Sequence, residues 1–166
     1  MLALLSLFLV SCPLSAKETT QNGVTNPKVT LVKNIIRDHG FAIAFASITL
    51  HVPKEQIVGT IATESANNSY AVSDDNARGL MQTREIADKT VGVECDSFDS
   101  WCSIWKGTSY KRYLRQKYGS IERATLAYFE GPKNMRKLTN KKVLSHPYLK
   151  TTQGYVRIAA QIFAGE

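Results

Sequence analysis

The chain has 166 residues, a net charge of +7 and a hydrophobic fraction of 43%. This length suits one domain with a short leader, and the hydrophobic fraction supports a buried core but excludes a membrane protein with several spans. The positive charge favours an anionic partner such as nucleic acid, anionic lipid or an anionic cell-wall glycan, although a generic solvated surface also carries such a charge.

The chain begins with sixteen residues that are mostly apolar and carry no charged side chain. This run is too short to span a bilayer as a helix, so residues 1–16 are predicted to be a signal peptide. Leu9-Val10-Ser11-Cys12 resembles the lipobox of bacterial lipoproteins, in which the cysteine is lipidated. The alternatives are export without a lipid, with cleavage after Ala16, and a wrongly assigned start codon. Polar residues 17–27 predict a flexible tether, which leaves 28–166 as the folded domain.

The first part of the domain has the apolar spacing of helices. One helix is expected from Lys28 to His39, with Gly40 as its C-cap, and a buried helix is expected from Phe41 to Leu50. Pro53 is typical of a first helical turn, so a further helix is expected to run from there to Glu64.

Glu64 lies on an apolar helix face. A helix places Ile57, Ile61 and Glu64 on one side because they are spaced i, i+4 and i+7. Burial there would disfavour the ionised carboxylate and raise its pKa, which suits a general acid near neutral pH. The alternative is a stray surface charge.

The rest of the domain also has helical spacing. Arg78–Thr90 and Trp101–Tyr118 are expected to be helices, and Ser120 is expected to cap another helix that stops at Gly131-Pro132. His146-Pro147 opens the last one. No long run alternates with period two, so the fold class is predicted to be all-α.

Two cysteines, Cys95 and Cys102, lie seven residues apart in a stretch rich in turn residues. A regular helix would separate their Cα atoms by about 10 Å, which is too far for a bridge, whereas a turn would bring them together. In an exported protein we expect a disulfide worth about 2.5 kcal/mol; the alternative is two free thiols. The sequence has no phosphate loop, no dinucleotide motif and no His/Cys cluster with metal-ligand spacing, so no cofactor and no metal are expected.

Four stretches between roughly residues 50 and 160 form an ordered pattern, and it is similar to the catalytic domain of the soluble lytic transglycosylases, within the lysozyme-like superfamily. The stretches are Glu64-Ser65 with Ala71, Ser73 and Ala77 to Gln82; Ser103 to Leu114; Leu126 to Pro132; and Thr152 to Val156.

The resemblance implies a lysozyme-like helical domain with a substrate groove between two lobes. It also implies an enzyme that cleaves the β-1,4 linkage between N-acetylmuramic acid and N-acetylglucosamine in peptidoglycan. In this family one glutamate, here Glu64, is first the acid and then the base, and the product carries a 1,6-anhydro end. The expected partner is therefore the peptidoglycan glycan strand, and the expected location is the periplasm, with attachment to the outer membrane through Cys12 if it is lipidated.

By the same resemblance, six further residues bind substrate. Gln82 would bond an acetamido group and Met81 would line the groove, although core filling is the alternative for Met81. Tyr128 and Tyr155 would flank Glu64, and the alternative for both is ordinary core packing. The alternative for Ser65 is helix capping. The six residues are Ser65, Ser73, Met81, Gln82, Tyr128 and Tyr155.

The chain departs from the family pattern at three positions, which are expected to alter glycan contacts. Phe129 replaces an asparagine, Thr151 a glutamate and Ser69 a common proline. Two alternative functions stay open. One is a lysozyme-type muramidase that hydrolyses the linkage on the same fold. The other, which Phe129 and Thr151 keep open, is a non-catalytic wall-binding scaffold of a secretion system. Nucleic-acid binding is not expected, because the basic residues form no clustered motif and the leader directs the chain out of the cytoplasm.

Overall fold

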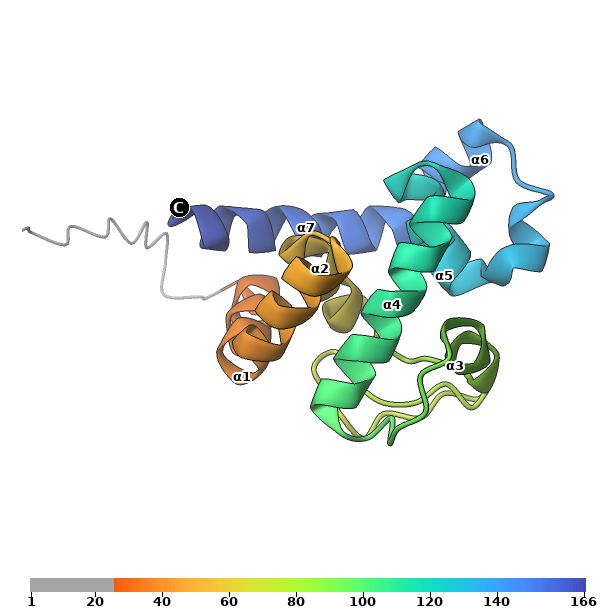
Figure 1. Cartoon of the computed structure of the whole chain (residues 1–166). Coiled ribbons are helices and arrows are strands. Elements are labelled where there is room, and N and C mark those ends of the chain that lie inside the picture. Colours follow the sequence, from red (N-terminus) through yellow and green to blue (C-terminus); the bar gives the residue numbers. More distant parts are fainter. Residues whose placement is uncertain (1–25) are drawn as a thin grey trace, which may run out of the picture.

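A computed structural model describes residues 26–166, which form helices joined by loops and, within that range, no strand beyond two isolated bridges (Figure 1). Cys12, the expected leader and most of the expected tether lie outside the described residues. The helices are α1 (Pro27–Leu50), α2 (Lys54–Glu64), α3 (Glu85–Val91), α4 (Ser100–Tyr118), α5 (Ile121–Met135), α6 (Asn140–Ser145) and α7 (Pro147–Ala164).

The buried side chains form two clusters, and these define two lobes. The first lobe is built on α1, α2 and the C-terminal half of α7, with Ile57 and Ile61 fully buried in it. The second lobe is built on α3 to α6 and the start of α7, around Leu114 and Leu126. The long helix α7 runs along both lobes (Figure 1). The all-α prediction is confirmed.

Helix α1 is continuous where the sequence predicted two helices. Gly40 was expected to end the first, yet α1 runs through it, because the buried stripe of Val32, Ile35, Ile43 and Ala46 continues with helical spacing on both sides of it. A glycine inside a helix costs about 1 kcal/mol, and packing of this stripe outweighs that cost. The helix ends instead at His51, which adopts the left-handed conformation.

The expected helix over Arg78–Thr90 is also shorter than predicted. Residues before Glu85 form turns and bridges, because Gly79 and Gln82 have φ angles of +75° and +47° that no helix accepts. At Gly79 a Cβ would lie 1.8 Å from the Ser97 carbonyl oxygen, so only glycine fits this close approach.

Other boundaries follow the sequence prediction. The Ser120 side chain caps α5 by accepting a bond of 3.1 Å from the Arg123 amide, and Gly119 ends α4 in the left-handed conformation. Gly131 (φ +76°) kinks α5 at the predicted stop, and a short helical continuation then reaches Met135.

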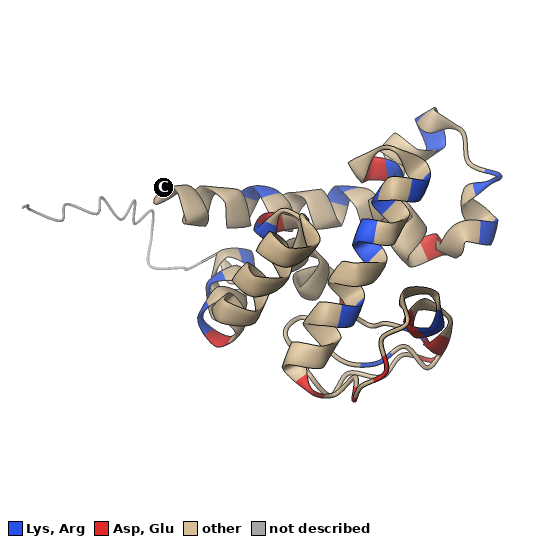
Figure 2. Ribbon diagram, in the orientation of Figure 1, with Lys and Arg blue, Asp and Glu red and all other residues tan. Residues whose placement is uncertain are grey.

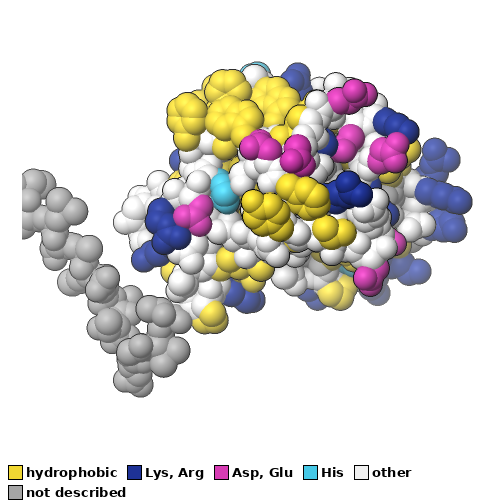
Figure 3. Space-filling model, turned by 90° about the horizontal axis from the view of Figure 1, so that it is seen from below, with side chains coloured by type: hydrophobic (Ala, Val, Ile, Leu, Met, Phe, Trp, Pro, Cys, Tyr) yellow, Lys and Arg dark blue, Asp and Glu magenta, His cyan; other side chains and the backbone are white. Residues whose placement is uncertain are grey.

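The surface divides into regions of different character. Lys and Arg residues are frequent along α4 and at the end of the molecule formed by α5 and α6 (Figure 2). From below, hydrophobic side chains gather at one corner of the molecule (Figure 3). On the exposed side of α1 and α4, Phe45 lies 5.3 Å from Trp101 and 5.8 Å from Trp105 between ring centroids. Within residues 26–166, no helix is both long and apolar enough to cross a membrane.

Candidate active site

Glu64 is the last residue of α2, one turn beyond the fully buried Ile61. Its side chain is not a stray surface charge. The carboxylate atom Oε1 accepts a short hydrogen bond from the hydroxyl group of Tyr148, which lies in the first turn of α7. Helix α2 thus presents the carboxylate to the other lobe, where the Tyr148 ring packs.

The close approach of α2 to α7 brings these two residues together. A Cβ at Gly59 would lie 2.6 Å from the Val156 side chain and 3.2 Å from the Thr152 carbonyl oxygen. Only a glycine lets the two helices approach so closely at this point. Glu64 and Tyr148 lie at the end of this contact, although 84 residues separate them in the sequence.

Opposing influences act on the pKa of Glu64. Burial is the largest, and it raises the pKa because a poorly solvated site disfavours the charged form. The hydrogen bond from Tyr148 lowers it, as do the positive charges of Lys111 and Arg84. The net shift is upward, which is the direction predicted for a general acid.

The loop between α2 and α3 is fastened to the second lobe through the backbone of Met81. Its amide donates to Ser103 Oγ at 3.1 Å, and its carbonyl oxygen accepts a bond of 2.7 Å from the Tyr128 hydroxyl. Gly107 makes this possible, since a Cβ there would lie 2.5 Å from the Met81 side chain and 2.8 Å from the Tyr128 hydroxyl oxygen. Tyr128 therefore anchors the loop. Burial is the main cause that raises the pKa of its hydroxyl group, and the nearby charge of Glu64 raises that pKa further.

Three polar residues expected to bind substrate shape the same loop. The Gln82 amide nitrogen donates to the carbonyl oxygens of Ala71 and Gly79, both at 2.9 Å, so its own oxygen is the atom left for a ligand. Ser73 Oγ accepts a 3.1 Å bond from the Ala77 amide. The Ser65 hydroxyl donates to the Ile61 carbonyl oxygen at 3.3 Å, which corresponds to the helix-end alternative for this residue.

The side chains of two expected substrate residues, Met81 and Tyr155, pack in or against the core of the first lobe. The Met81 side chain is fully buried in the core of the first lobe, which corresponds to its core-filling alternative. Tyr155 packs against the same core, with the Lys28 ammonium 5.6 Å from its ring centroid. The α7 tyrosine that bonds Glu64 is Tyr148, two helical turns earlier.

These contacts place the site where the lobes meet. Glu64 and Met81 extend from the first lobe, and each bonds a tyrosine of the second, Tyr148 and Tyr128 respectively. A depression of about 100 Å³ is lined by Gln82 and Tyr128 together with Arg84 and residues of α3, α4 and α5, and Glu64 is not part of its lining.

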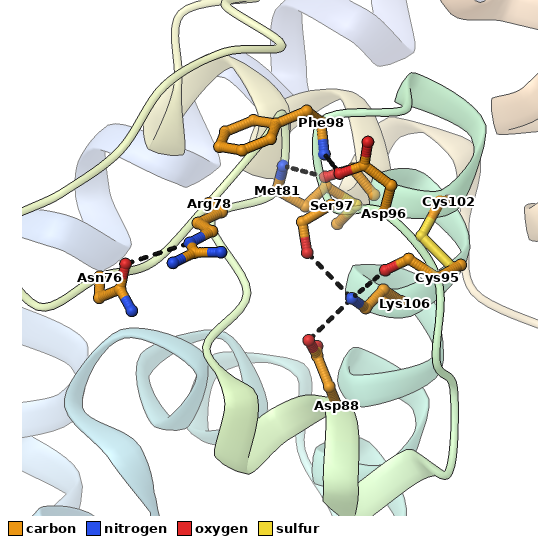
Figure 4. Close-up of polar contacts among 11 residues, drawn as sticks. Asn76, Arg78, Met81, Asp88, Cys95, Asp96, Ser97, Phe98, Cys102 and Lys106 are labelled. Carbon is orange, nitrogen blue, oxygen red and sulfur yellow. Dashed lines mark hydrogen bonds and ion pairs between the residues drawn. A yellow bond between two sulfur atoms is a disulfide. The ribbon is translucent and has the colours of Figure 1, made fainter.

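A second polar centre fixes the loop that precedes α4. The buried Lys106 ammonium donates to the Cys95 carbonyl oxygen at 3.0 Å and to Ser97 Oγ at 2.9 Å, and pairs with Asp88 at 2.7 Å (Figure 4). The expected disulfide between Cys95 and Cys102 is present, with the Cα atoms 6.0 Å apart because Cys95 lies in the loop and not in the helix. Among residues 26–166 no group of His, Cys, Asp and Glu side chains could hold a metal ion.

Three residues that shape the surroundings of Glu64 were not singled out from the sequence. Tyr148 belongs to the apolar face of its helix, and nothing marks its hydroxyl as special. Gly59 has no motif. Lys111 carried a usable signal, because a charged residue seven positions after the buried Ile104 lies on the inner face of α4.

Comparison with known proteins places the chain in a family. The family model for the transglycosylase SLT domain matches residues 41–146, which run from within α1 to the start of α7.

Two curated relatives show similar sequences. One is a transglycosylase of Enterobacteria phage PRD1, 32% identical over 89 residues that cover 54% of this chain and 33% of the relative. Another is a membrane-bound lytic murein transglycosylase E of Buchnera aphidicola subsp. Acyrthosiphon pisum, 30% identical over 104 residues that cover 55% of this chain and 46% of the relative. The matched part thus spans less than half of each relative.

A solved structure shows the same fold. The X-ray structure of the lytic transglycosylase Slt from Pseudomonas aeruginosa, an inactive mutant in which glutamine replaces a glutamate, aligns with a TM-score of 0.64 and 17% identity. The alignment covers 80% of this chain and 28% of that one. By its fold and by the match of the family model over most of its folded part, the chain belongs to the transglycosylase SLT domain family.

Proposed function

We propose that the protein is a peptidoglycan lytic transglycosylase with Glu64 as its single catalytic carboxyl group. The observation that carries this proposal is the state of Glu64. Its carboxyl group is largely buried where the lobes meet, its pKa is raised by burial, and Tyr148 fixes its orientation. The relatives described as transglycosylases support the same reaction.

In the proposed reaction Glu64 protonates the glycosidic oxygen between N-acetylmuramic acid and N-acetylglucosamine, and the bond from C1 to that oxygen breaks. The Glu64 carboxylate then takes the proton from the C6 hydroxyl of the muramic residue, whose oxygen bonds to C1. Glu64 regains its proton, no water is consumed, and the product is a 1,6-anhydro sugar. The substrate supplies its own nucleophile, so proximity replaces a second protein group.

The charges around Glu64 favour this reaction over hydrolysis by two carboxylates. Glycosidases of the two-carboxylate type place the groups about 5–9.5 Å apart. Among residues 26–166, the charged groups that act on the pKa of Glu64 are both cations, Lys111 and Arg84. Asp74 and Asp75 lie exposed in the loop, and Asp75 pairs with Arg84 at 3.5 Å.

Phe129, a departure from the family pattern, also supports an active enzyme. Its half-exposed ring stacks on the Tyr148 ring, with centroids 4.4 Å apart and an interplanar angle of 15°. The stacking keeps the Tyr148 ring in the position from which its hydroxyl group bonds Glu64. Phe129 therefore helps to fix the orientation of the acid. Thr151 lies exposed on α7. We infer that these departures tune glycan contacts and that the protein is more than a wall-binding scaffold.

We further propose that residues 1–16 export the protein and that lipidation of Cys12 attaches it to the outer membrane on its periplasmic side. The apolar uncharged leader and its lipobox-like segment support this location. In cell fractions the wild-type protein should stay with membranes, whereas Cys12→Ser should be released. A Cys12→Ser protein that still pellets with membranes would contradict lipidation.

The decisive experiment is digestion of purified sacculi by the wild-type protein and by Glu64→Gln, with mass spectrometry of the released muropeptides. We expect 1,6-anhydro ends from the wild type and a loss of at least about 100-fold in Glu64→Gln, because the general acid is removed. Glu55→Gln, on the first turn of the same helix, is the matched control and should keep full activity.

The products separate the alternatives. Reducing ends in place of anhydro ends would show a muramidase that hydrolyses the bond. Sacculus binding with no product from the wild type would show a scaffold. Full activity of Glu64→Gln with an intact fold would remove Glu64 from the mechanism.

A further inference from the structure

The buried part of the molecule contains a cation that the proposed reaction does not yet use. Lys111 lies in the middle of α4 with 6% of its surface exposed, and its ammonium group has no hydrogen-bond partner among residues 26–166. Burying an unpaired charge is costly, so natural cores rarely keep one without a reason. Its presence calls for a role beyond packing.

The ammonium group of Lys111 lies beside a tyrosine that bonds the loop next to Glu64. Its ammonium lies 5.3 Å from the centroid of the Tyr128 ring, and that tyrosine anchors the loop beside Glu64. Its stem passes Val52 and Ala124 in a small apolar depression between α2 and α5.

The titratable and charged groups near this pair come from each neighbouring element. Helix α2 contributes Glu64, and the nearby tyrosines come from α4, α5 and α7. Positive charges come from the turn before α3 and from the next turn of α4, and an aspartate of α3 also acts on Tyr128. These groups are Glu64, Tyr110, Tyr128, Tyr148, Arg84, Arg115 and Asp88.

The mutual influence of Lys111 and Glu64 is visible in both pKa values. Burial lowers the pKa of Lys111 to about 8, and the charge of Glu64 opposes that decrease. In turn the Lys111 charge lowers the pKa of Glu64 against the effect of burial. Lys111 is therefore still mostly protonated at pH 7.

A cation that lies near an acid but makes no hydrogen bond to it is well suited to catalysis, because the acid must first donate its proton and then regain it. A direct ion pair would hold Glu64 ionised and remove the proton it has to donate. With no cation at all, the carboxylate formed after donation would be left unstabilised in a buried site. A charge acting through space stabilises that carboxylate and leaves the proton available.

We infer that Lys111 is a positioning residue that acts through Glu64, as a buried counter-charge for the carboxylate formed when the proton has left. This role rests on the proposed function of Glu64 as the acid. It deepens that function by adding an electrostatic partner on a helix that carries no part of the acid itself.

The test compares Lys111→Met with the wild type in the pH dependence of kcat/KM on sacculi or soluble glycan strands. Loss of the cation raises the pKa of Glu64, so the alkaline limb should move to higher pH. The weaker acid should also lower kcat by about tenfold, because an electrostatic contribution to the developing charge is lost. The matched control is Arg112→Met, which removes an exposed positive charge at the next position of α4 and should leave both quantities unchanged.

A second measurement does not need activity. The ¹³C chemical shift of the Glu64 carboxyl carbon, assigned with Glu64→Gln, should titrate at higher pH in Lys111→Met than in the wild type. An unchanged titration and an unchanged alkaline limb would overturn the inference and leave a purely structural lysine. Full activity of Glu64→Gln would instead overturn the proposed function, while the titration would still report whether the two charges are coupled.

Discussion

Two buried lysines of α4, five residues apart, differ in how they are satisfied. Lys106 has 3% of its surface exposed and bonds three partners, including the Asp88 carboxylate. Lys111 is buried almost as deeply and bonds none of the described residues. A buried charge with a full set of hydrogen bonds stabilises one local geometry. A buried charge without them destabilises the fold, but its electrostatic field can still act on another ionisable group. The difference separates a structural lysine from the one we assign to the active site.

The largest expected loss of stability belongs to the structural lysine. Lys106→Met leaves the Asp88 carboxylate without its cation and frees the loop around Cys95, so the free energy of unfolding should fall by about 3 kcal/mol. Urea denaturation measures it. The pH dependence of the remaining activity should be unchanged. If Lys106→Met has the same free energy of unfolding as the wild type, the ion pair does not contribute to stability, and the two lysines do not differ in the way proposed.

Lys111→Met should change stability in the opposite direction. The folded-state pKa of Lys111 is about 8, below its ordinary 10.5, so between these values the unfolded chain binds more protons than the folded chain. The stability of the wild type relative to Lys111→Met should therefore rise with pH across this window, by about 3 kcal/mol in total. Below pH 8 the penalty is fully present, and the methionine variant should be the more stable protein.

Denaturation series at pH 7 and pH 10 measure this difference. A difference between the two proteins that does not vary with pH would mean that the ammonium is well solvated or bonded in solution. In that case Lys111 would resemble Lys106 after all.

The smallest expected effect concerns the uncharged partner of the acid. Tyr148→Phe removes the hydrogen bond to Glu64 but keeps the ring that stacks on Phe129. The pKa of Glu64 should rise, since that bond lowers it, and kcat should fall by about tenfold, as expected for the loss of a bond worth about 1.5 kcal/mol. The alkaline limb of kcat/KM should move to higher pH, as in Lys111→Met.

The double variant Tyr148→Phe with Lys111→Met sharpens the comparison. If both residues act on the Glu64 carboxylate through different interactions, the alkaline limb of kcat/KM should move to a higher pH in the double variant than in either single variant. No additional displacement in the double variant would mean that both reach Glu64 through one shared rearrangement.

Most of the helices were predictable because their determinants are local. Apolar spacing identified the buried faces, and Ser120 and Gly131 marked ends of helices through cap and backbone chemistry. Gly40 misled the prediction, because glycine is a helix stop only where packing does not continue beyond it, and the stripe from Val32 to Ala46 does continue.

The sequence by itself determined that the domain is helical, that Glu64 ends an apolar helix face, and that Cys95 and Cys102 were candidates for a bridge. Only the tertiary structure decided that Tyr148, and not Tyr155, bonds Glu64, that the Met81 side chain belongs to the core, and that Lys111 is buried without a partner. The physical reason is distance along the chain. Partners 84 residues apart meet only because Gly59 lets α2 and α7 pack closely, and no local pattern records which side chains that contact brings together.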